Sequence, residues 1–355
     1  MGQYYPMTSA EPKTGISLCM IVRDEAHCIE TVLSTTRPHV EEIVLVDTGS
    51  KDSTVSIATP YVDILNHFSW VDNFSAARNF SLSLAKQPWI LVLDADEVIA
   101  PQDFPKLRQL IESDTYDGFY LTQRLYGNNN LSDDAVWKLA DGNDPFSKQY
   151  RGYKENPILR LFRNQPCIQY EGRVHEHVDQ SIPKNRIYDA RIPIHHYHEN
   201  PQNDTEKHEL RNLAIQEDVI RANQATATDY LSAGTVHLRT TGKLDRAEEY
   251  LLKASELGGE VGLTLEVLAE AYYRSGQLTK ALKLYERLYD TGKGSTAVLN
   301  NLSNLLVKMG DLRRSAKLLG ELLEKEIDDP ARRQRIQQNL KAVRGAIHDQ
   351  LDGDG

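Results

Sequence analysis

The chain has 355 residues, of which 40% are hydrophobic and 26% are charged. This length exceeds the roughly 100–200 residues of one ordinary domain, so we expect two domains with real cores. No apolar run approaches the ~18 residues that a membrane-spanning helix needs, and the amino terminus lacks the apolar stretch of a signal peptide. We therefore expect a cytoplasmic protein without a membrane span.

Charge and cysteine content exclude further classes. The formal net charge of -10 disfavours broad attraction to nucleic acid or anionic membranes, although a local basic patch stays open. The three cysteines, Cys19, Cys28 and Cys167, cannot all pair and show no C-x-x-C spacing. A disulfide framework and a structural zinc site are therefore not expected.

Up to about residue 200 the sequence alternates short apolar runs with helical stretches and turns, which is typical of an α/β layer structure. Helical stretches begin near His27, near Asp52 and at Phe74. Because strands that alternate with helices usually pair in parallel, we expect a mostly parallel sheet. The predicted strands are Ile16–Val22, Ile43–Val46, Val62–Leu65 and Trp89–Leu93.

Acidic residues follow the first, second and fourth of these strands. The carboxyl ends of the strands are where open parallel sheets bind ligands, so these acids are expected to converge on one functional rim. They are Asp24 and Glu25, then Asp47, then Asp94 and Asp96.

The segment WILVLDADE places Asp94 and Asp96 one residue apart at the end of a buried strand. Strand alternation would point both carboxylates to the same side. Two such groups can help hold a hard divalent cation, which in turn can bind a diphosphate. A lone D-x-D is more often a solvated turn, so its companion motifs have to decide between the two interpretations.

After residue 225 the periodicity becomes helical, and Gly242, Gly276 and Gly310 recur at intervals of 34 residues. That is the period of tetratricopeptide repeats. Small residues keep the same register, as expected where paired helices cross closely. They are Thr235, Ala269 and Ser303 before the glycines, and Ala247, Ala281 and Ser315 after them.

These patterns predict four segments. An α/β domain covers residues 1–200, a connecting helix covers 201–227, three repeats cover 228–329, and a capping helix with a tail covers 330–355. The last helix has a basic character, which usually marks a solvated cap rather than a nucleic-acid surface.

Five motifs in order, SLCMIVRDEA, IVLVDTGSKDST, WVDNFSAARN, ILVLDADE and EGRVHEHV, resemble a family 2 glycosyltransferase of the GT-A fold. The resemblance spans about residues 16–200. It is closest to the branch in which tetratricopeptide repeats follow the catalytic domain. The sequence departs from that branch at Asp24, where Asn is more usual, and at His198 and Glu199, where small and aromatic residues are more usual.

The resemblance implies that the backbone around Val22 and Arg23 and the side chain of Asp47 hold the nucleotide of a sugar nucleotide. By itself, Asp47 before Thr48 and Gly49 would more often start a turn. Asp72 and Arg78 lie at the entry to a helix whose free N–H groups suit phosphate, although Arg78 could equally support Asp94 or Asp96.

In the segment EGRVHEHV we expect a strand that turns His175 and His177 to one side and Glu176 to the other. The resemblance places His175 and Glu176 on the acceptor side, so Glu176 is the candidate general base. It also makes His196 the candidate third metal ligand beside Asp94 and Asp96, or else a contact to the diphosphate. His195 and His198 are expected to be surface or gating residues.

The expected function is a metal-dependent transfer of a sugar from a nucleoside-diphosphate sugar, preferably a UDP-sugar, with Mn²⁺ or Mg²⁺. The resemblance implies that the transfer inverts the configuration at the anomeric carbon. A protein or peptide acceptor held by the repeats is the first choice. A saccharide, a lipid-linked saccharide and a modified nucleic acid are alternatives, and the repeats could instead pair copies of the chain. An inactive scaffold also stays open, although the intact acidic motifs argue against it.

Overall fold

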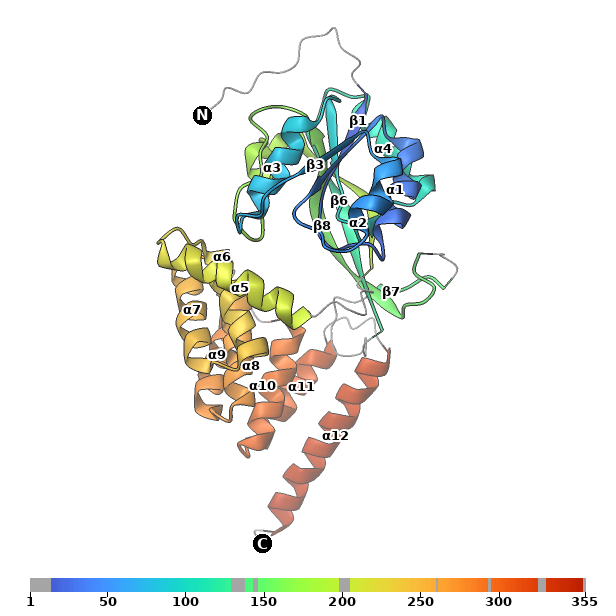
Figure 1. The fold of residues 1–355 in the computed structure, drawn as a ribbon. Coiled ribbons are helices and arrows are strands. Elements are labelled where there is room, and N and C mark those ends of the chain that lie inside the picture. The colour runs from blue at the N-terminus through green and yellow to red at the C-terminus, as the bar shows by residue number, and fades with distance from the viewer. Residues whose placement is uncertain are drawn as a thin grey trace. The chain divides into compact units, whose positions relative to one another are not determined.

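The computed structural model describes residues 14–128, 138–142, 146–197, 205–259, 261–292, 295–324 and 330–353. The chain forms two compact units that divide near residue 203. The first contains a sheet with helices, and the second is built from helices (Figure 1). The predicted tail residues after 353 and the departures at His198 and Glu199 lie outside the described residues.

Within the described residues, the first unit contains one nine-stranded sheet with the strand order β3-β2-β1-β4-β8-β6-β9-β5, and β7 pairs with β8. The strands are β1 (Ile16–Val22), β2 (Glu42–Asp47), β3 (Ile64–His67), β4 (Trp89–Val92), β5 (Glu97–Val98), β6 (Gly118–Gly127), β7 (Lys138–Leu139), β8 (Gly152–Arg163) and β9 (Ile187–His196).

The half of the sheet formed by β3, β2, β1 and β4 is parallel, as the sequence predicts. Its strands match the predicted ranges closely except at β3, which begins two residues later than Val62. A short helical turn at Thr59–Tyr61 precedes it, so the ladder with β2 opens only at Ile64.

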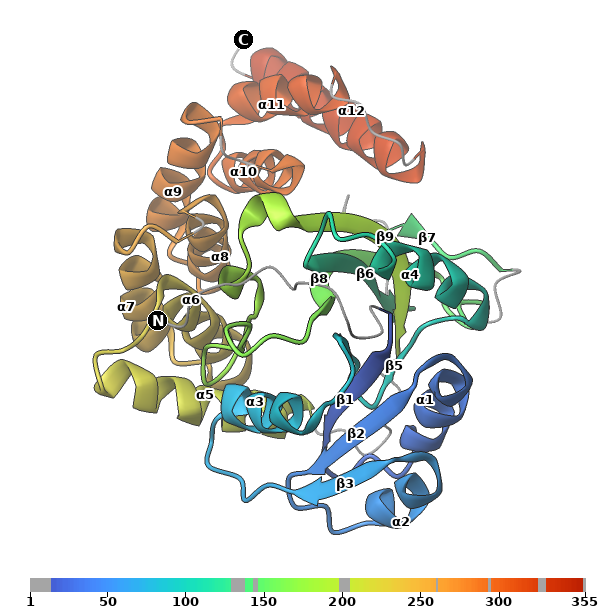
Figure 2. The same ribbon diagram turned by 90° about the horizontal axis from the view of Figure 1, so that it is seen from above.

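Helices cover both faces of this parallel half, because its strands are apolar on both sides. Figure 2 shows β1, β2 and β3 side by side between α3 and the pair formed by α1 and α2. Alternate residues of β1 pack on opposite faces: Leu18 belongs to the core under α1, whereas Cys19 packs with Leu82 of α3. The helices of this unit are α1 (Ile29–Thr36), α2 (Thr54–Ala58), α3 (Phe74–Leu84) and α4 (Phe104–Ile111).

The other half of the sheet, formed by β8, β6, β9 and β5, is mixed and was not predicted as strands. It brings residues that lie far apart in the sequence next to the end of β4. The strand predicted over 171–178 is absent: this segment is a loop closed by one bridge between Glu171 and His177. His175 has a φ of +55° and Gly172 of +96°, and such a backbone cannot continue an extended strand.

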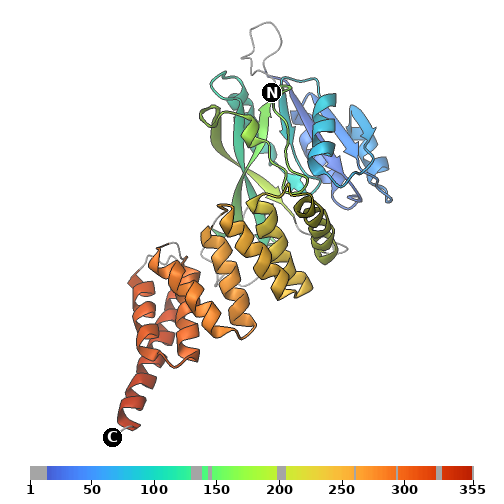
Figure 3. The same ribbon diagram turned by 90° about the vertical axis from the view of Figure 1, so that its left-hand side faces the viewer.

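The second unit begins with α5 (Thr205–Arg221) and continues as helix pairs at the predicted 34-residue period. Figure 3 shows these helices alternating in direction along the stack. They are α6 (Ala227–Val236), α7 (Leu244–Glu256), α8 (Val261–Arg274), α9 (Leu278–Asp290), α10 (Thr296–Lys308), α11 (Leu312–Glu324) and the terminal α12 (Pro330–Gly353).

The repeated glycines make the turns between paired helices, as predicted. Gly242, Gly276 and Gly310 have φ values of +67°, +78° and +83°, a region in which a side chain would be strained. The small residues lie where the paired helices meet: Ser303 of α10 and Ser315 of α11 share a hydrogen bond of 2.8 Å.

Among the residues that the structure describes, no helix combines the length and the hydropathy needed to cross a membrane.

Candidate active site

The loops that follow β1 and β2 are bonded to each other at the carboxyl edge of the sheet. The backbone N–H of Glu25 donates to Oγ1 of Thr54 at 2.7 Å, and the N–H of Lys51 donates to Oδ1 of Asp24 at 2.6 Å. The N–H of Ala26 donates to Oδ2 of Asp52 at 3.1 Å. The predicted rim therefore exists, and its backbone is held by side chains of the opposing loop.

Asp47 ends β2 and is largely buried. Its carboxylate accepts hydrogen bonds from the backbone N–H groups of Gly49 at 3.1 Å and Ser50 at 3.0 Å, and Nδ1 of His67 lies 3.3 Å away. Burial raises the pKa of Asp47, but these hydrogen bonds outweigh it and the net pKa is lowered. The carboxylate therefore shapes the turn after β2, which is the local role that the sequence also allowed.

The two residues that the sequence singled out at the end of β1 differ in exposure. Val22 is buried, and its carbonyl accepts hydrogen bonds from the N–H and the hydroxyl of Thr48 at 2.9 and 3.1 Å. Arg23 is exposed, with Nε 3.8 Å from the carboxylate of Asp24. A ligand at this edge would thus meet the Arg23 side chain before the Val22 carbonyl.

The D-x-D segment is a turn rather than the end of a strand, since β4 stops at Val92 and the N–H of Glu97 donates to the carbonyl of Asp94 at 3.1 Å. Alternation therefore does not set the direction of its carboxylates. Asp94 contacts two arginines: Nη2 of Arg78 donates to Oδ1 at 2.7 Å, and Nη2 of Arg160 donates to Oδ2 at 2.6 Å.

These arginines dominate the electrostatics around Asp94. Burial would raise the pKa of Asp94, but Arg160 and Arg78 hold it well below its usual range. Burial lowers the pKa of each guanidinium, yet Asp94 first and then Glu176 or Glu97 raise it above the ordinary value. Asp94 is therefore an ionised carboxylate with both oxygens engaged by buried cations.

Arg78 also reaches Glu176, the candidate base. Nε of Arg78 donates to Oε1 of Glu176 at 2.7 Å, so one guanidinium joins two carboxylates that lie 82 residues apart in the sequence. Of the two roles predicted for Arg78, the structure shows the support of Asp94. Its Nη1 is buried and has no hydrogen-bond partner among the described residues.

The loop that carries Glu176 is fixed to the amino end of α3. The N–H of Phe74 donates to the carbonyl of Arg173 at 2.9 Å, and the hydroxyl of Ser75 donates to the carbonyl of Gly172. Glu176 is 15% exposed at its side chain, whereas His175 is exposed. The predicted pairing of His175 and His177 on one strand face is wrong, because no strand forms there.

Asp72 does not join this cluster. It is exposed and has a φ of +53°, and its Oδ1 accepts a hydrogen bond from Nε1 of Trp70 at 2.7 Å. The residue that caps α3 is Asn73, whose side chain accepts from the N–H of Ala76 at 3.0 Å. Asp72 therefore orders the approach to α3.

Asp96 lies next to His196, the candidate third metal ligand. Nε2 of His196 lies 3.1 Å from Oδ2 of Asp96. Burial lowers the pKa of His196, but Asp96 and then Glu97 and Asp94 raise it above its ordinary value. His195, expected at the surface, is instead 2% exposed, because β9 turns it inward against Phe146 and Tyr126, whose hydroxyl lies 2.7 Å from Nδ1.

Three residues of the site were missed from the sequence: Arg160, Glu97 and Gln123. Nη2 of Arg160 donates to Oε1 of Glu97 at 2.8 Å, and Nε2 of Gln123 donates to the same oxygen at 2.5 Å. Two of them, Arg160 and Glu97, left a signal in the sequence. Arg160 interrupts the apolar run ILRLF of a buried strand, and Glu97 directly follows D-A-D.

The residues around Asp96 fit a divalent cation. Two neighbouring ligands with bonds of about 2.1 Å lie about 3 Å apart, which is close to the separation of Asp96 Oδ2 and His196 Nε2. Oxygen and imidazole donors both suit Mn²⁺. Asp94 fits less well as a direct ligand, since two arginines already engage its oxygens.

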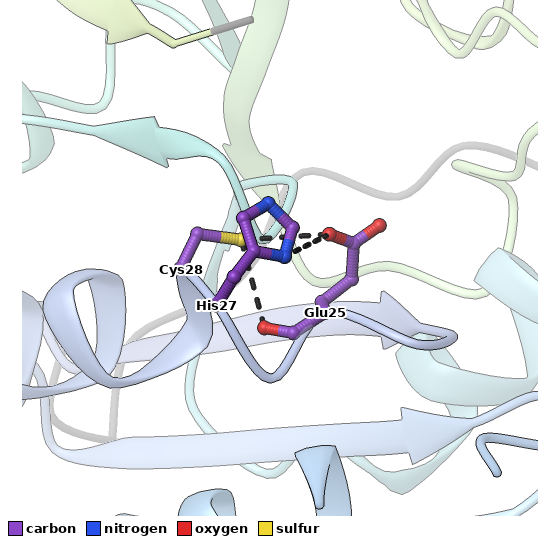
Figure 4. Close-up of side chains that lie close together, drawn as sticks. All are labelled: Glu25, His27 and Cys28. Carbon is purple, nitrogen blue, oxygen red and sulfur yellow. Dashed lines mark hydrogen bonds and ion pairs between the residues drawn. The ribbon is translucent and has the colours of Figure 1, made fainter. Parts of the chain in front are cut away.

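A second group of metal-binding atoms lies in the turn after β1 (Figure 4). One ligand atom each of Glu25, His27 and Cys28 lies within 4.8 Å of the others. The pKa of Glu25 is raised to about 7: burial is the main cause, the Cys28 thiol opposes it, and nearby Asp96 and Asp94 add to the rise. Hydrogen bonds inside the turn account for this arrangement, since Sγ of Cys28 donates to Oε2 of Glu25 at 3.4 Å.

Comparison with known proteins finds two family matches in the chain. Residues 17–174 match the model of glycosyl transferase family 2, and residues 272–340 match a tetratricopeptide repeat model. A TPR repeat-containing protein of Synechococcus elongatus is 36% identical over 167 residues, or 47% of this chain and 36% of that protein. The SPbeta prophage-derived glycosyltransferase SunS of Bacillus subtilis is 25% identical over 246 residues, or 67% of this chain and 53% of SunS. The chain thus spans less than two thirds of the length of these relatives.

Among solved structures, S. aureus TarS 1–349 in complex with UDP-GlcNAc has a TM-score of 0.41 and 12% identity. The matched region covers 78% of this chain and 92% of the TarS chain. The two family matches confirm the resemblance drawn from the motifs and agree with the mixed α/β sheet of the first unit. Residues 17–174 therefore form a family 2 glycosyl transferase domain built on the mixed α/β sheet, and the helical region that follows contains a tetratricopeptide repeat match.

Proposed function

We propose that this protein is a metal-dependent, inverting glycosyltransferase that uses a nucleoside-diphosphate sugar, preferably a UDP-sugar, as its donor. The observation that carries the proposal is the buried ion network in which Arg78 joins Asp94 to Glu176 beside the Asp96–His196 pair. It supports the proposal because one guanidinium contacts both the candidate base Glu176 and Asp94 of the D-x-D segment.

Asp96 and His196 would hold the cation, and Asp94 would be held by its arginines next to it. A divalent ion bound there, Mn²⁺ or Mg²⁺, would offset the charge that develops on the departing diphosphate. Arg23 and the loop that Asp47 shapes would receive the nucleotide at the neighbouring strand ends. The orphaned Nη1 of Arg78 is a further donor that suits an anionic ligand.

Glu176 would take the proton from the acceptor hydroxyl as its oxygen attacks the anomeric carbon. Among the described residues, Arg78 donates a hydrogen bond to Oε1 of Glu176 and not to Oε2. Oε2 would therefore accept the proton. A single displacement with one base inverts the configuration at the anomeric carbon, and inversion is therefore part of the proposal. Since His175 is exposed in the same loop, it would sit toward the acceptor.

For the acceptor we propose a protein or peptide, because stacked tetratricopeptide repeats present extended surfaces that suit peptides. A saccharide is the second candidate. It is favoured by two relatives of Rhizobium meliloti, a succinoglycan biosynthesis protein and a lipopolysaccharide core biosynthesis glycosyltransferase, which match about a third of this chain.

The alternative of an inactive scaffold is disfavoured by the burial of charge. Arg78, Arg160 and Glu97 are each buried, and removing charges from water is costly unless the arrangement serves a purpose. A scaffold would gain as much stability from apolar residues at these positions.

The test is a thermal-shift and hydrolysis screen of sugar nucleotides with Mn²⁺, Mg²⁺ or a chelator. We expect one donor to stabilise the wild type in the presence of metal, and Asp96→Ala to abolish both this shift and donor hydrolysis. Asp189→Ala is the control, because this exposed acid of β9 forms its ion pair with Arg191, away from Asp96 and His196. Wild-type hydrolysis by Asp96→Ala would overturn the metal assignment.

A further inference from the structure

Behind the candidate cation site lies a chain of buried polar side chains from three different strands. Arg160 comes from β8, Glu97 from β5 and Gln123 from β6. The side chain of Glu97 is 0% exposed and that of Arg160 is 4% exposed. No solvent-facing role can explain these residues, so their contacts inside the protein must.

Glu97 is the centre of this chain. Its Oε1 accepts hydrogen bonds from Nη2 of Arg160 at 2.8 Å and Nε2 of Gln123 at 2.5 Å. Its Oε2 accepts from the backbone N–H of Asp94 at 2.9 Å. One carboxylate therefore fixes the D-x-D backbone while it holds two further side chains.

One end of the chain fixes the side chain of Asp94. The same Nη2 of Arg160 that bonds Glu97 also donates to Oδ2 of Asp94 at 2.6 Å. Asp94 is thus held at its backbone by Glu97 and at its carboxylate by Arg160. The turn that carries Asp96 begins from this doubly anchored residue.

The other end of the chain reaches the ring of His196. Nε2 of Gln123 lies 2.9 Å from Nδ1 of His196, and Oε1 of Glu97 lies 4.0 Å from the same nitrogen. Register explains this meeting, because Glu97 and His196 are direct partners across the β5–β9 ladder. Nε2 of His196 faces Asp96, while Gln123 and Glu97 lie next to Nδ1 on the opposite side of the ring. These two residues therefore orient the ring toward Asp96.

We propose that Arg160 and Gln123 are positioning residues that act through Glu97 to hold Asp96 and His196 in the geometry for a divalent cation. The inference rests on the proposed function, because it concerns the cation that the transfer would use. Groups that orient metal ligands without touching the metal typically change metal affinity by 10- to 100-fold when they are removed.

The test compares two buried arginines of the same strand. Arg163 is 6% exposed, pairs with Asp114 at 2.8 Å and stacks on Trp89 at 4.2 Å, and none of these partners belongs to the site. Arg160→Met and Arg163→Met thus remove the same group from β8 with similar burial. Both variants are checked by circular dichroism, and Mn²⁺ binding at saturating UDP is measured from the free-Mn²⁺ signal in electron paramagnetic resonance.

We expect Arg160→Met to weaken Mn²⁺ binding by 10- to 100-fold and Arg163→Met to leave it within about twofold of the wild type. Gln123→Met is the second variant, in case Arg160→Met does not fold, and we expect the same loss from it. Folded Arg160→Met or Gln123→Met protein that binds Mn²⁺ as tightly as the wild type would overturn the inference. A wild type that binds no Mn²⁺ with UDP would instead overturn the metal dependence itself, and the inference with it.

Discussion

The sheet unit and the repeat unit bury different kinds of polar group. The sheet unit buries charged side chains such as Arg78, Glu97 and Arg160, each bonded to groups from other elements. In the described part of the repeats, the buried polar residues are His237, Thr264, Ser303 and Ser315, and none is an acid, a lysine or an arginine.

This difference distinguishes a unit that buries ions from repeats whose buried polar groups are His, Thr and Ser side chains. Buried ions are expensive, so their concentration beside the D-x-D segment indicates that the first unit is built around reactive geometry. Small residues at helix crossings allow close packing of the paired helices. We therefore expect substitutions in the sheet unit to reduce turnover and substitutions in the repeats to reduce stability. The following variants test that expectation.

The largest effect is expected from Glu176→Gln. The amide keeps the shape of the side chain but cannot accept the proton, so hydrolysis and transfer should fall by about 10²- to 10⁴-fold while donor binding is retained. The measurement is donor affinity and turnover in the same preparation. Glu171→Gln is the control. This exposed acid lies at the start of the same loop, and among the described residues its side chain has no ion pair with Arg78. A loss of only a few-fold would move the base to another residue, with His175 next.

In the repeats, Ala281→Leu should change stability and leave the chemistry unchanged. Ala281 is fully buried where α9 packs on α8, and extra methylenes in such a site cost about 1–3 kcal/mol. Denaturant unfolding followed by circular dichroism measures the loss, and donor hydrolysis should stay at the wild-type rate. Lys283→Leu, on the exposed side of the same helix, is the control. A parallel collapse of hydrolysis would show that the two units are not separable.

The smallest effect is expected from Glu25→Gln, which tests the electrostatics of the rim. The pKa of Glu25 is raised to about 7, mainly by burial and in part by the neighbouring carboxylates of Asp96 and Asp94. The folded state then binds more protons than the unfolded state between about pH 4.5 and 7, so this group destabilises the fold as the pH rises.

The change in the free energy of unfolding caused by Glu25→Gln should therefore be more favourable at pH 8 than at pH 5.5. We expect a difference of about 1 kcal/mol, because Glu25 is partly exposed. Unfolding at both pH values with a chelator present measures this difference, and the exposed Glu112→Gln is the control. An identical change in stability at both pH values would contradict the raised pKa.

Much of the architecture was predictable because it depends on local periodicity. Short apolar runs between helical stretches predicted β1, β2 and β4. The 34-residue period predicted the repeats and their glycine turns. The rim acids were predictable for the same reason, since each follows a strand directly. The strand expected over 171–178 failed because two positive φ angles, which alternation of residue types does not reveal, bend the segment into a loop.

By itself the sequence determined the parallel strands β1 to β4 with the helices between them, the repeat register and the position of Asp94, Asp96 and Glu176 along the chain. Only the tertiary structure decided which groups meet: Arg78 with Glu176, Arg160 with Asp94, and Gln123 with His196. The physical reason is range. Periodicity reflects neighbours within a few residues, whereas these contacts form only when the mixed strands β8, β6 and β9 fold against the end of β4.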